Sequence, residues 1–225
     1  MSFSINGKTA IVTGAANGIG LAIARHFADR GANVMCADMD EKRLHEELGD
    51  VAEEGNIRYF AGALRQRLTI ANLVSATIDA FDQVDILVNA SRQVMETDAL
   101  DPEDTSVETL LEQNLMTALR RSQQVARRMI KQAKDDTESA CVGSIINLSS
   151  IAAHQTRPEL LGYSIASAGL EQMTRSMALA LAPKRIRVNA VAFGSVMSAS
   201  LKSSIGDHPE WRDEIENRTP LHRIA

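Results

Sequence analysis

Residues 9–24 read TAIVTGAANGIGLAIA and decide the fold. An apolar, β-branched run precedes a glycine-rich turn and then a helical spacing of apolar residues, which predicts a strand, a tight loop and a helix. In such a unit Gly14 permits the turn, Gly18 lets the backbone approach a pyrophosphate, and Gly20 lets helix and strand pack closely. The free N–H groups at the helix start favour a bound phosphate. The stretch therefore predicts a dinucleotide-binding loop, with a plain glycine turn as the alternative.

The rest of the chain alternates short apolar runs with longer helical patterns. The runs are continuous rather than alternating, as in strands that are covered on both faces. Alternating strands and helices predict a parallel sheet with right-handed crossovers. We therefore expect a single α/β domain over residues 1–225, a doubly wound, Rossmann-like sheet in three layers. The further expected strands are residues 33–37, 57–61, 85–89, 144–148 and 187–192, and the expected helices are residues 18–29, 41–54, 68–80, 105–134 and 162–181.

Composition narrows the class of protein. The chain has 225 residues, 44% hydrophobic and 24% charged, which is ordinary for a globular domain. Its net charge of −5, without a basic block, argues against nucleic acid or an anionic membrane as a partner. No signal peptide and no run of about 20 apolar residues is visible, so we expect a cytoplasmic protein. Cys36 and Cys141 are expected to be buried free thiols, and the histidines are not spaced for a metal site.

Asp38 ends the second expected strand, eighteen residues after Gly20. A carboxylate at this place can accept hydrogen bonds from an adenosine ribose, and its charge repels a 2′-phosphate. NAD is therefore favoured over NADP, although the nearby Arg43 leaves NADP open. A helix-capping role for Asp38 is the alternative, and one residue can do both.

With these motifs in place, the whole chain resembles the short-chain dehydrogenase/reductase family. The matching segments follow the family's order: TGAANGIG at 13–20, DILVN at 85–89, Asn114, INLSS at 146–150, Tyr163 and IRVNAVAFG at 186–194. The resemblance implies an NAD(H)-dependent oxidoreductase that interconverts a small alcohol and a carbonyl compound. It also implies a homodimer or homotetramer built through the helices at 105–134 and 162–181.

Four positions correspond to the family's catalytic serine, tyrosine, lysine and asparagine. By this resemblance Ser150 would bind the substrate oxygen, Tyr163 would give or take the proton, and Asn114 would hold a water molecule. Ser167 stands at the position of the lysine. The residues themselves leave open a strand-end cap for Ser150, a helix-start residue for Tyr163 and a packing role for Asn114.

The resemblance also implies cofactor contacts, and several of them depart from the family pattern. Leu64 stands where an aspartate touches adenine, Arg92 or Ser91 alters the NNAG turn after the fourth strand, and Phe193 replaces proline. Residues 195–225 resemble a substrate-covering segment with a short helix near 210–215. The sequence ends at LHRIA, before the family's further helix and last strand, so the sheet is expected to lack that strand. The implied cofactor contacts are Gly14, Asn17, Gly18, Ile19, Gly20, Asp38, Leu64, Asn89, Ala90, Gly194 and Val196.

The serine at position 167 has a physical consequence. A free tyrosine has a pKa of about 10, and a nearby cation favours its charged form, whereas a serine hydroxyl supplies no charge. Arg92 is the candidate replacement, because its loop is expected to border the nicotinamide. We favour an oxidoreductase whose activity is weak. A non-catalytic NAD-binding protein, acting as a sensor or subunit partner, and a structural oligomer subunit without a cofactor remain as alternatives.

Overall fold

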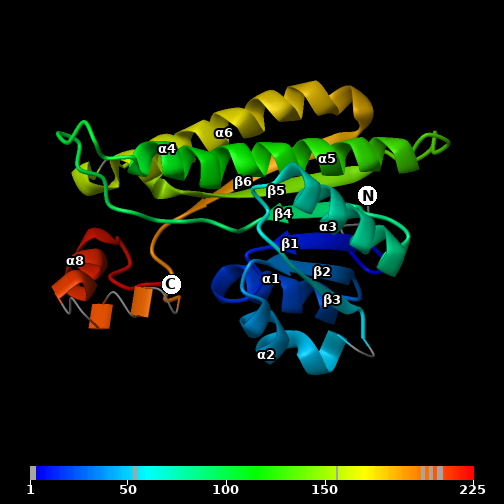
Figure 1. The fold of residues 1–225 in the computed structure, drawn as a ribbon, viewed down its shortest axis with the longest axis horizontal. Coiled ribbons are helices and arrows are strands. Elements are labelled where there is room, and N and C mark those ends of the chain that lie inside the picture. The colour runs from blue at the N-terminus through cyan, green and yellow to red at the C-terminus, as the bar shows by residue number, and fades with distance from the viewer. Residues whose placement is uncertain (1–3, 53–54, 156, 199–200, 203–204, 207–209) are drawn as a thin grey trace.

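Six parallel strands form one sheet with the order β3-β2-β1-β4-β5-β6 (Figure 1). This computed structural model describes residues 4–52, 55–155, 157–198, 201–202, 205–206 and 210–225. The doubly wound α/β fold that the sequence predicts is confirmed. The strands are β1 (Thr9–Thr13), β2 (Asn33–Asp38), β3 (Ile57–Ala61), β4 (Ile86–Asn89), β5 (Gly143–Ser150) and β6 (Ile186–Phe193).

Helices cover both faces of the sheet and make three layers. Figure 1 shows α1 and α2 on one face and α4, α5 and α6 on the other, and α3 packs against α5. Each face has its own apolar core, one that includes Leu21 and Leu44 and one that includes Leu73 and Met129. The helices are α1 (Gly18–Asp29), α2 (Glu41–Ala52), α3 (Arg67–Phe81), α4 (Ser106–Leu110), α5 (Thr117–Gln132), α6 (Leu161–Leu181) and α8 (Glu210–Arg218).

The helix expected over residues 105–134 is interrupted by a π-helical turn, η1 (Leu111–Met116), between α4 and α5. The Thr117 hydroxyl donates to the carbonyl of Glu112, 2.7 Å away and five residues back, which suits the wider turn. The buried Asn114 lies in this turn. The uniform helix predicted from apolar spacing was therefore wrong at the segment that carries a candidate site residue.

Other boundaries differ by a few residues. β5 is longer than predicted at both ends, while β4 begins at Ile86 rather than at Asp85. The last two residues of the helix expected at 41–54 lie outside the described residues. β6 forms one edge of the sheet, since it pairs with β5 alone among the described strands.

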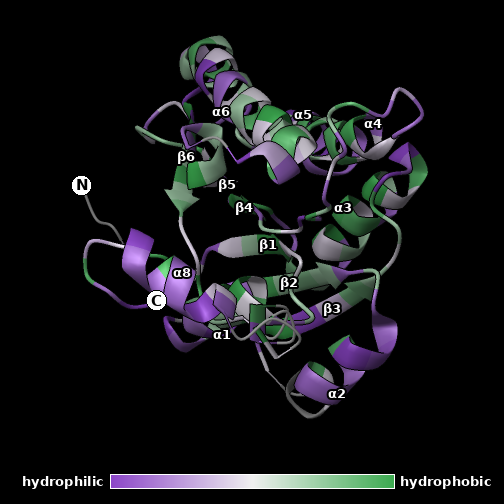
Figure 2. Cartoon of the chain, turned by 90° about the vertical axis from the view of Figure 1, so that its left-hand side faces the viewer, coloured by the Kyte–Doolittle hydropathy of each residue, from purple (hydrophilic) through white to green (hydrophobic). Residues whose placement is uncertain are grey.

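Residues 195–198 follow β6 and are hydrogen-bonded to the last residue of the sequence. The Met197 N–H donates to the carbonyl of Ala225 at 2.8 Å, and the Ala225 N–H donates to that of Ser195 at 3.3 Å. Figure 2 shows that α8, like α2, is largely hydrophilic. Its start at Glu210 agrees with the short helix expected near 210–215.

The cysteines correct one expectation. Both are free, and Cys36 is buried in β2, but Cys141 is exposed just before β5. In the described part of the chain, no helix has the length and apolar character needed to cross a membrane.

Candidate active site

The glycine loop between β1 and α1 is packed against the loop that follows β4. Gly14 has a φ of +70°, and a Cβ atom there would lie 2.8 Å from the Cα of Ser91. A Cβ on Gly20 would overlap the carbonyl oxygen of Gly14. Both positions therefore require glycine, one for a turn and one for close packing of helix on loop. At Gly18, with φ +52°, a Cβ atom would lie 3.8 Å from the Cβ of Ser198, its nearest contact among the described residues.

Asp38 joins the end of β2 to this glycine loop. Its Oδ2 accepts a hydrogen bond from the Ala16 N–H at 3.1 Å, and its Oδ1 accepts from Met39 N–H at 2.7 Å. The start of α2 is instead capped by Asp40, whose Oδ1 accepts from the Arg43 N–H at 3.0 Å. Asp38 thus lies beside the glycine loop, where the sequence predicts a ribose-binding carboxylate.

Thr13 holds the loop after β4 in place. Its buried Oγ1 accepts from the N–H groups of Ala90 at 3.1 Å and Ser91 at 3.3 Å. Asn89 is buried below, where its Nδ2 donates to Asn147 Oδ1 at 2.8 Å. Sequence reasoning missed Thr13, because a threonine in a strand is an ordinary buried residue until its neighbours are known.

The carboxyl ends of β4 and β5 and helix α6 enclose a small cavity. Its volume is about 10 Å³, and a space of about that size holds roughly one water molecule. The structure thus brings together three of the four predicted catalytic residues. Ser150 is not part of the lining. The lining residues are Asn89, Ser91, Arg92, Asn114, Ala118, Leu148, Tyr163, Ser167 and Leu170.

Arg92 bridges two sides of the site. Its Nη1 lies 3.1 Å from the Tyr163 hydroxyl, to which it donates. Its guanidinium carbon lies 4.8 Å from the centre of the Phe193 ring. Arg92 and Phe193, two residues that the resemblance predicts to depart from the family pattern, are therefore in direct contact.

Ser150 and Asn114 have other partners in this structure. The Ser150 Oγ accepts from the Ala152 N–H at 3.1 Å and caps a 3₁₀ turn after β5, as the strand-end alternative expected. The Asn114 amide makes two 2.8 Å bonds to the main chain of Gln93, one as acceptor and one as donor. Asn114 therefore fixes the segment that follows Arg92.

The remaining predicted cofactor residues are dispersed around the glycine loop and β6. Leu64 is buried in the core that includes Leu73, so a side chain at this position packs inward. Asn17 and Gly194 are exposed, and Ile19 and Val196 are half-buried. Ser198, two residues after Val196, is the residue that approaches Gly18, which the sequence did not reveal.

Arg121 of α5 is a buried charge next to the site. Its side chain is fully buried, and its Nη1 donates to Ser91 Oγ at 2.7 Å. Within the described residues, its Nε and Nη2 have no hydrogen-bond partner. Burial lowers the pKa of Arg121 to about 10. Arg121 thus lies on the inner side of α5, whereas Arg127 of the same helix is exposed.

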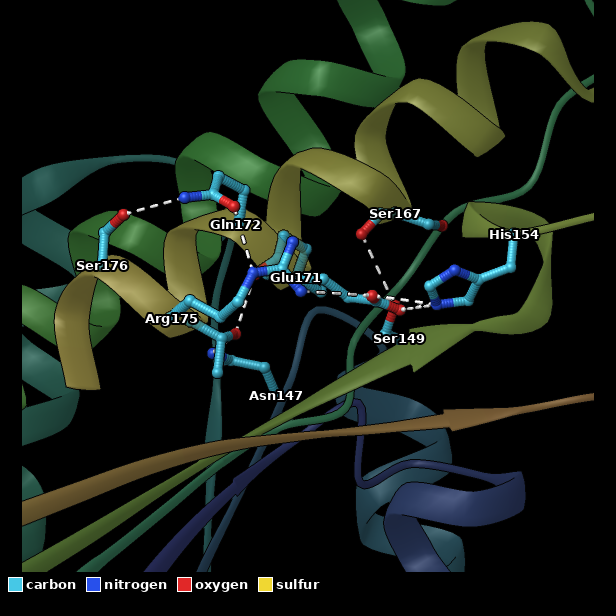
Figure 3. A network of polar contacts seen from close by, with 10 residues as sticks. Asn147, Ser149, His154, Ser167, Glu171, Gln172, Arg175 and Ser176 are labelled. Atoms are coloured by element: carbon cyan, nitrogen blue, oxygen red, sulfur yellow. Dashed lines mark hydrogen bonds and ion pairs between the residues drawn. The ribbon is translucent and has the colours of Figure 1, made fainter. Parts of the chain in front are cut away.

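A second polar network fastens α6 to β5 (Figure 3). The Glu171 carboxylate accepts from the Ser149 hydroxyl at 3.0 Å and pairs with His154 Nε2 at 3.0 Å. Asn147 donates to the Thr174 hydroxyl at 2.8 Å. These contacts fix the rotation of α6 and hence the direction in which its first two turns present their side chains. In the part of the chain that the structure describes, no cluster of three or more His, Cys, Asp or Glu could hold a metal.

The chain is similar to known oxidoreductases along almost its full length. A family model described as enoyl-(acyl carrier protein) reductase matches residues 14–225. An L-rhamnose 1-dehydrogenase (NAD(P)(+)) of Azotobacter vinelandii is 36% identical over 227 residues, covering 97% of this chain and 84% of that protein. A short chain dehydrogenase/reductase of Colletotrichum higginsianum is 29% identical over 226 residues, covering 99% and 82%. The crystal structure of gox2181 matches with a TM-score of 0.87 at 28% identity, covering 98% of this chain and 84% of that one.

Proposed function

The chain belongs to the short-chain dehydrogenase/reductase family of oxidoreductases, and we propose that it interconverts a small alcohol and its carbonyl compound with NAD(H). The observation that carries the proposal is the buried phenol of Tyr163 in the cavity beyond β4 and β5, with the glycine loop alongside. A phenol at this place can exchange a proton with a substrate oxygen.

The residues of the glycine loop suit a dinucleotide. Gly14 and Gly20 hold a turn that a Cβ atom would obstruct, and Gly18 has a positive φ of +52°. The helix α1 begins at this loop, so its first N–H groups favour phosphate. When bound, the cofactor supplies or accepts the hydride, and the protein's own residues handle the proton.

Asp38 supports a preference for NAD over NADP. Its carboxylate lies against the glycine loop, where its charge would repel a 2′-phosphate. The similar Azotobacter vinelandii protein is named for both NAD and NADP, so the preference in this chain rests on Asp38 alone.

We propose that turnover is slow, because Ser167 occupies the position of the family's lysine. Its side chain is buried one helical turn after Tyr163 and carries no charge. General acid–base catalysis by a positioned side chain typically accelerates a reaction by about 10²–10⁴-fold.

A second candidate function is a dinucleotide-binding protein without turnover. The cavity of about 10 Å³ beside Tyr163 favours it, since that volume is too small to hold a substrate.

Two measurements separate these candidates. Titration of the protein with NADH and NADPH, followed by cofactor fluorescence, tests binding, and no binding at millimolar concentration would contradict both. A panel of aldoses, polyols, simple alcohols and ketones is then assayed with each cofactor. The proposal expects turnover that Tyr163→Phe removes while NADH binding persists. Binding without turnover on every substrate would favour the non-catalytic candidate.

A further inference from the structure

The site contains a cation that contacts the reacting oxygen, although the lysine position does not supply it. We propose that Arg92 stabilises the negative charge that forms on Tyr163 during proton transfer, and that it is a further catalytic residue. This inference rests on the proposed function, in which Tyr163 is the proton donor and acceptor. The charge is thus supplied by the loop after β4 instead of by α6.

The proton step creates a need for a cation at this place. When Tyr163 gives its proton to a substrate oxygen, the O–H bond of the phenol breaks and its electron pair remains as negative charge on the phenol oxygen. The side chain is only 6% exposed, so water contributes little to stabilising that charge. The neighbouring Ser167 is buried as well and offers a neutral hydroxyl.

Arg92 is placed to meet this need. Its Nη1 donates to the Tyr163 oxygen at 3.1 Å, which is the distance of an ordinary hydrogen bond. The guanidinium keeps its charge at every pH at which an enzyme works. A hydrogen bond from a charged donor becomes stronger when the acceptor is an anion, so this contact favours the phenolate over the phenol.

Phe193 holds the arginine from its other side. The guanidinium carbon lies 4.8 Å from the ring centre, within the range of a cation–π interaction. Phe193 ends β6, and Ser150 at the end of β5 is its partner in the sheet register. The arginine thus spans from the loop after β4 to β6, across the end of the strand between them. We regard Phe193 as a positioning residue that acts through Arg92.

Three other charged groups on the elements around Tyr163 are engaged elsewhere. Arg121 of α5 donates to Ser91. Glu112 of η1 pairs with Arg120. Glu171 of α6 pairs with His154. Among the described residues, Arg92 is the charged group whose hydrogen bond to the phenol is observed.

This assignment links three substitutions that otherwise look independent. Ser167 removes a charge from the site, Arg92 brings one in, and Phe193 supplies the aromatic face on which that charge rests. Loss of activity alone does not explain why an arginine lies within hydrogen-bond distance of Tyr163.

A direct test needs neither cofactor nor substrate. The chain has two tyrosines, so Tyr59→Phe leaves Tyr163 as the only source of phenolate absorbance. In that background, Arg92→Gln should move the midpoint of the phenolate titration to higher pH, because the cation is lost but a donor remains. Arg92→Lys should move it less. Arg30→Ala, which removes an exposed arginine at the end of α1, should leave the midpoint unchanged. An unchanged midpoint in Arg92→Gln would overturn the proposal.

Kinetics supply the second test. Arg92→Gln should lower kcat by about tenfold or more with little change in KM, as expected for lost acid–base help. Adding Ser167→Lys to Arg92→Gln should restore part of the loss, whereas the same lysine beside an intact Arg92 should give a smaller relative gain. A variant Arg92→Gln with full or raised kcat contradicts the assignment. If the Ser167→Lys variants do not fold, Arg92→Lys tests the assignment instead. The assignment requires a higher kcat in Arg92→Lys than in Arg92→Gln. If wild-type protein turns over no substrate, the proposed function fails, while the phenolate titration still decides the role of Arg92.

Discussion

The Asp38 carboxylate accepts a hydrogen bond from the main chain of Ala16, so the end of β2 and the glycine loop are held together by one side chain. The other oxygen of the same carboxylate accepts from the N–H groups of Met39 and Asp40. A single residue therefore shapes the loop that would hold phosphate and presents the charge that would select against a 2′-phosphate.

We predict that Asp38→Ala weakens NADH binding and changes the cofactor preference. Loss of a hydrogen bond to a charged acceptor costs roughly 1.5–3 kcal/mol, which corresponds to a loss of about tenfold or more in affinity. NADPH should lose less than NADH, because the repulsive charge is gone as well. The measurement is the dissociation constant of each cofactor by fluorescence titration.

Asp40→Ala is the matched control for that experiment. Asp40 caps α2 through the Arg43 N–H and has the same charge, but it makes no bond to the glycine loop. It should lower stability slightly and leave the NADH to NADPH ratio unchanged. An equal effect of both substitutions on that ratio would show that net charge, and not the contact with Ala16, sets the preference.

We predict that two buried threonines of β1 respond oppositely to replacement by valine. Thr13 accepts from the Ala90 and Ser91 N–H groups, so Thr13→Val leaves two donors without their acceptor and should cost about 1–3 kcal/mol. The Thr9 hydroxyl is buried with no hydrogen-bond partner in the described structure, so Thr9→Val should be neutral or stabilising. Urea unfolding of both variants checks this. A loss of stability in Thr9→Val equal to that in Thr13→Val would mean that shape, not hydrogen bonding, matters at both positions.

The sequence predicted the sheet, the glycine loop and the location of Tyr163 because these features have local causes. Continuous β-branched runs and glycines at fixed spacing depend on neighbours within a few residues. The helix α1 was predicted with its observed bounds, Gly18–Asp29. The π-turn at Asn114 was not, since apolar spacing does not reveal it, and the bonds that Asn114 makes from it reach Gln93, twenty-one residues away in the chain.

The contacts of the site were harder to predict for the same reason. Arg92 was the candidate cation by elimination, but its stacking on Phe193 joins residues about a hundred positions apart. Arg121 shares α5 with the exposed Arg127 and the half-buried Arg120 and Arg128, and apolar periodicity gave no reason to single it out. Its buried guanidinium donates to Ser91, thirty residues away in the chain.

We predict that the two cysteines differ in reactivity. Burial raises the pKa of Cys36 to about 12, so almost none of it is thiolate at pH 8, and reagent cannot reach it in the folded protein. Cys141 is exposed and should react quickly. A thiol reagent should therefore modify one group per folded chain, none in Cys141→Ser, and two per chain in denaturant. Fast modification of the folded Cys141→Ser variant would contradict the structure around β2.

We predict, finally, that Arg121→Met stabilises the protein near neutral pH. The fold lowers the pKa of this guanidinium from its ordinary value to about 10, so the charged form is less favourable in the folded state than in the unfolded chain. That cost is present at every pH below the folded value and diminishes as the pH rises above about 10. A methionine of similar length removes the buried charge at the loss of one bond to Ser91, with an expected gain of about 1–3 kcal/mol.

Thermal unfolding at pH 7 and at pH 10 measures this effect. The advantage of Arg121→Met over the wild type should be larger at pH 7, because the wild type recovers part of its stability as the guanidinium loses its proton. Arg127→Met is the control, since Arg127 is exposed on the same helix and its replacement should change stability by less than about 0.5 kcal/mol. A clear loss of stability in Arg121→Met at pH 7 would mean that Arg121 has an electrostatic partner in solution, and a bound anion against Ser91 would then be the group to look for.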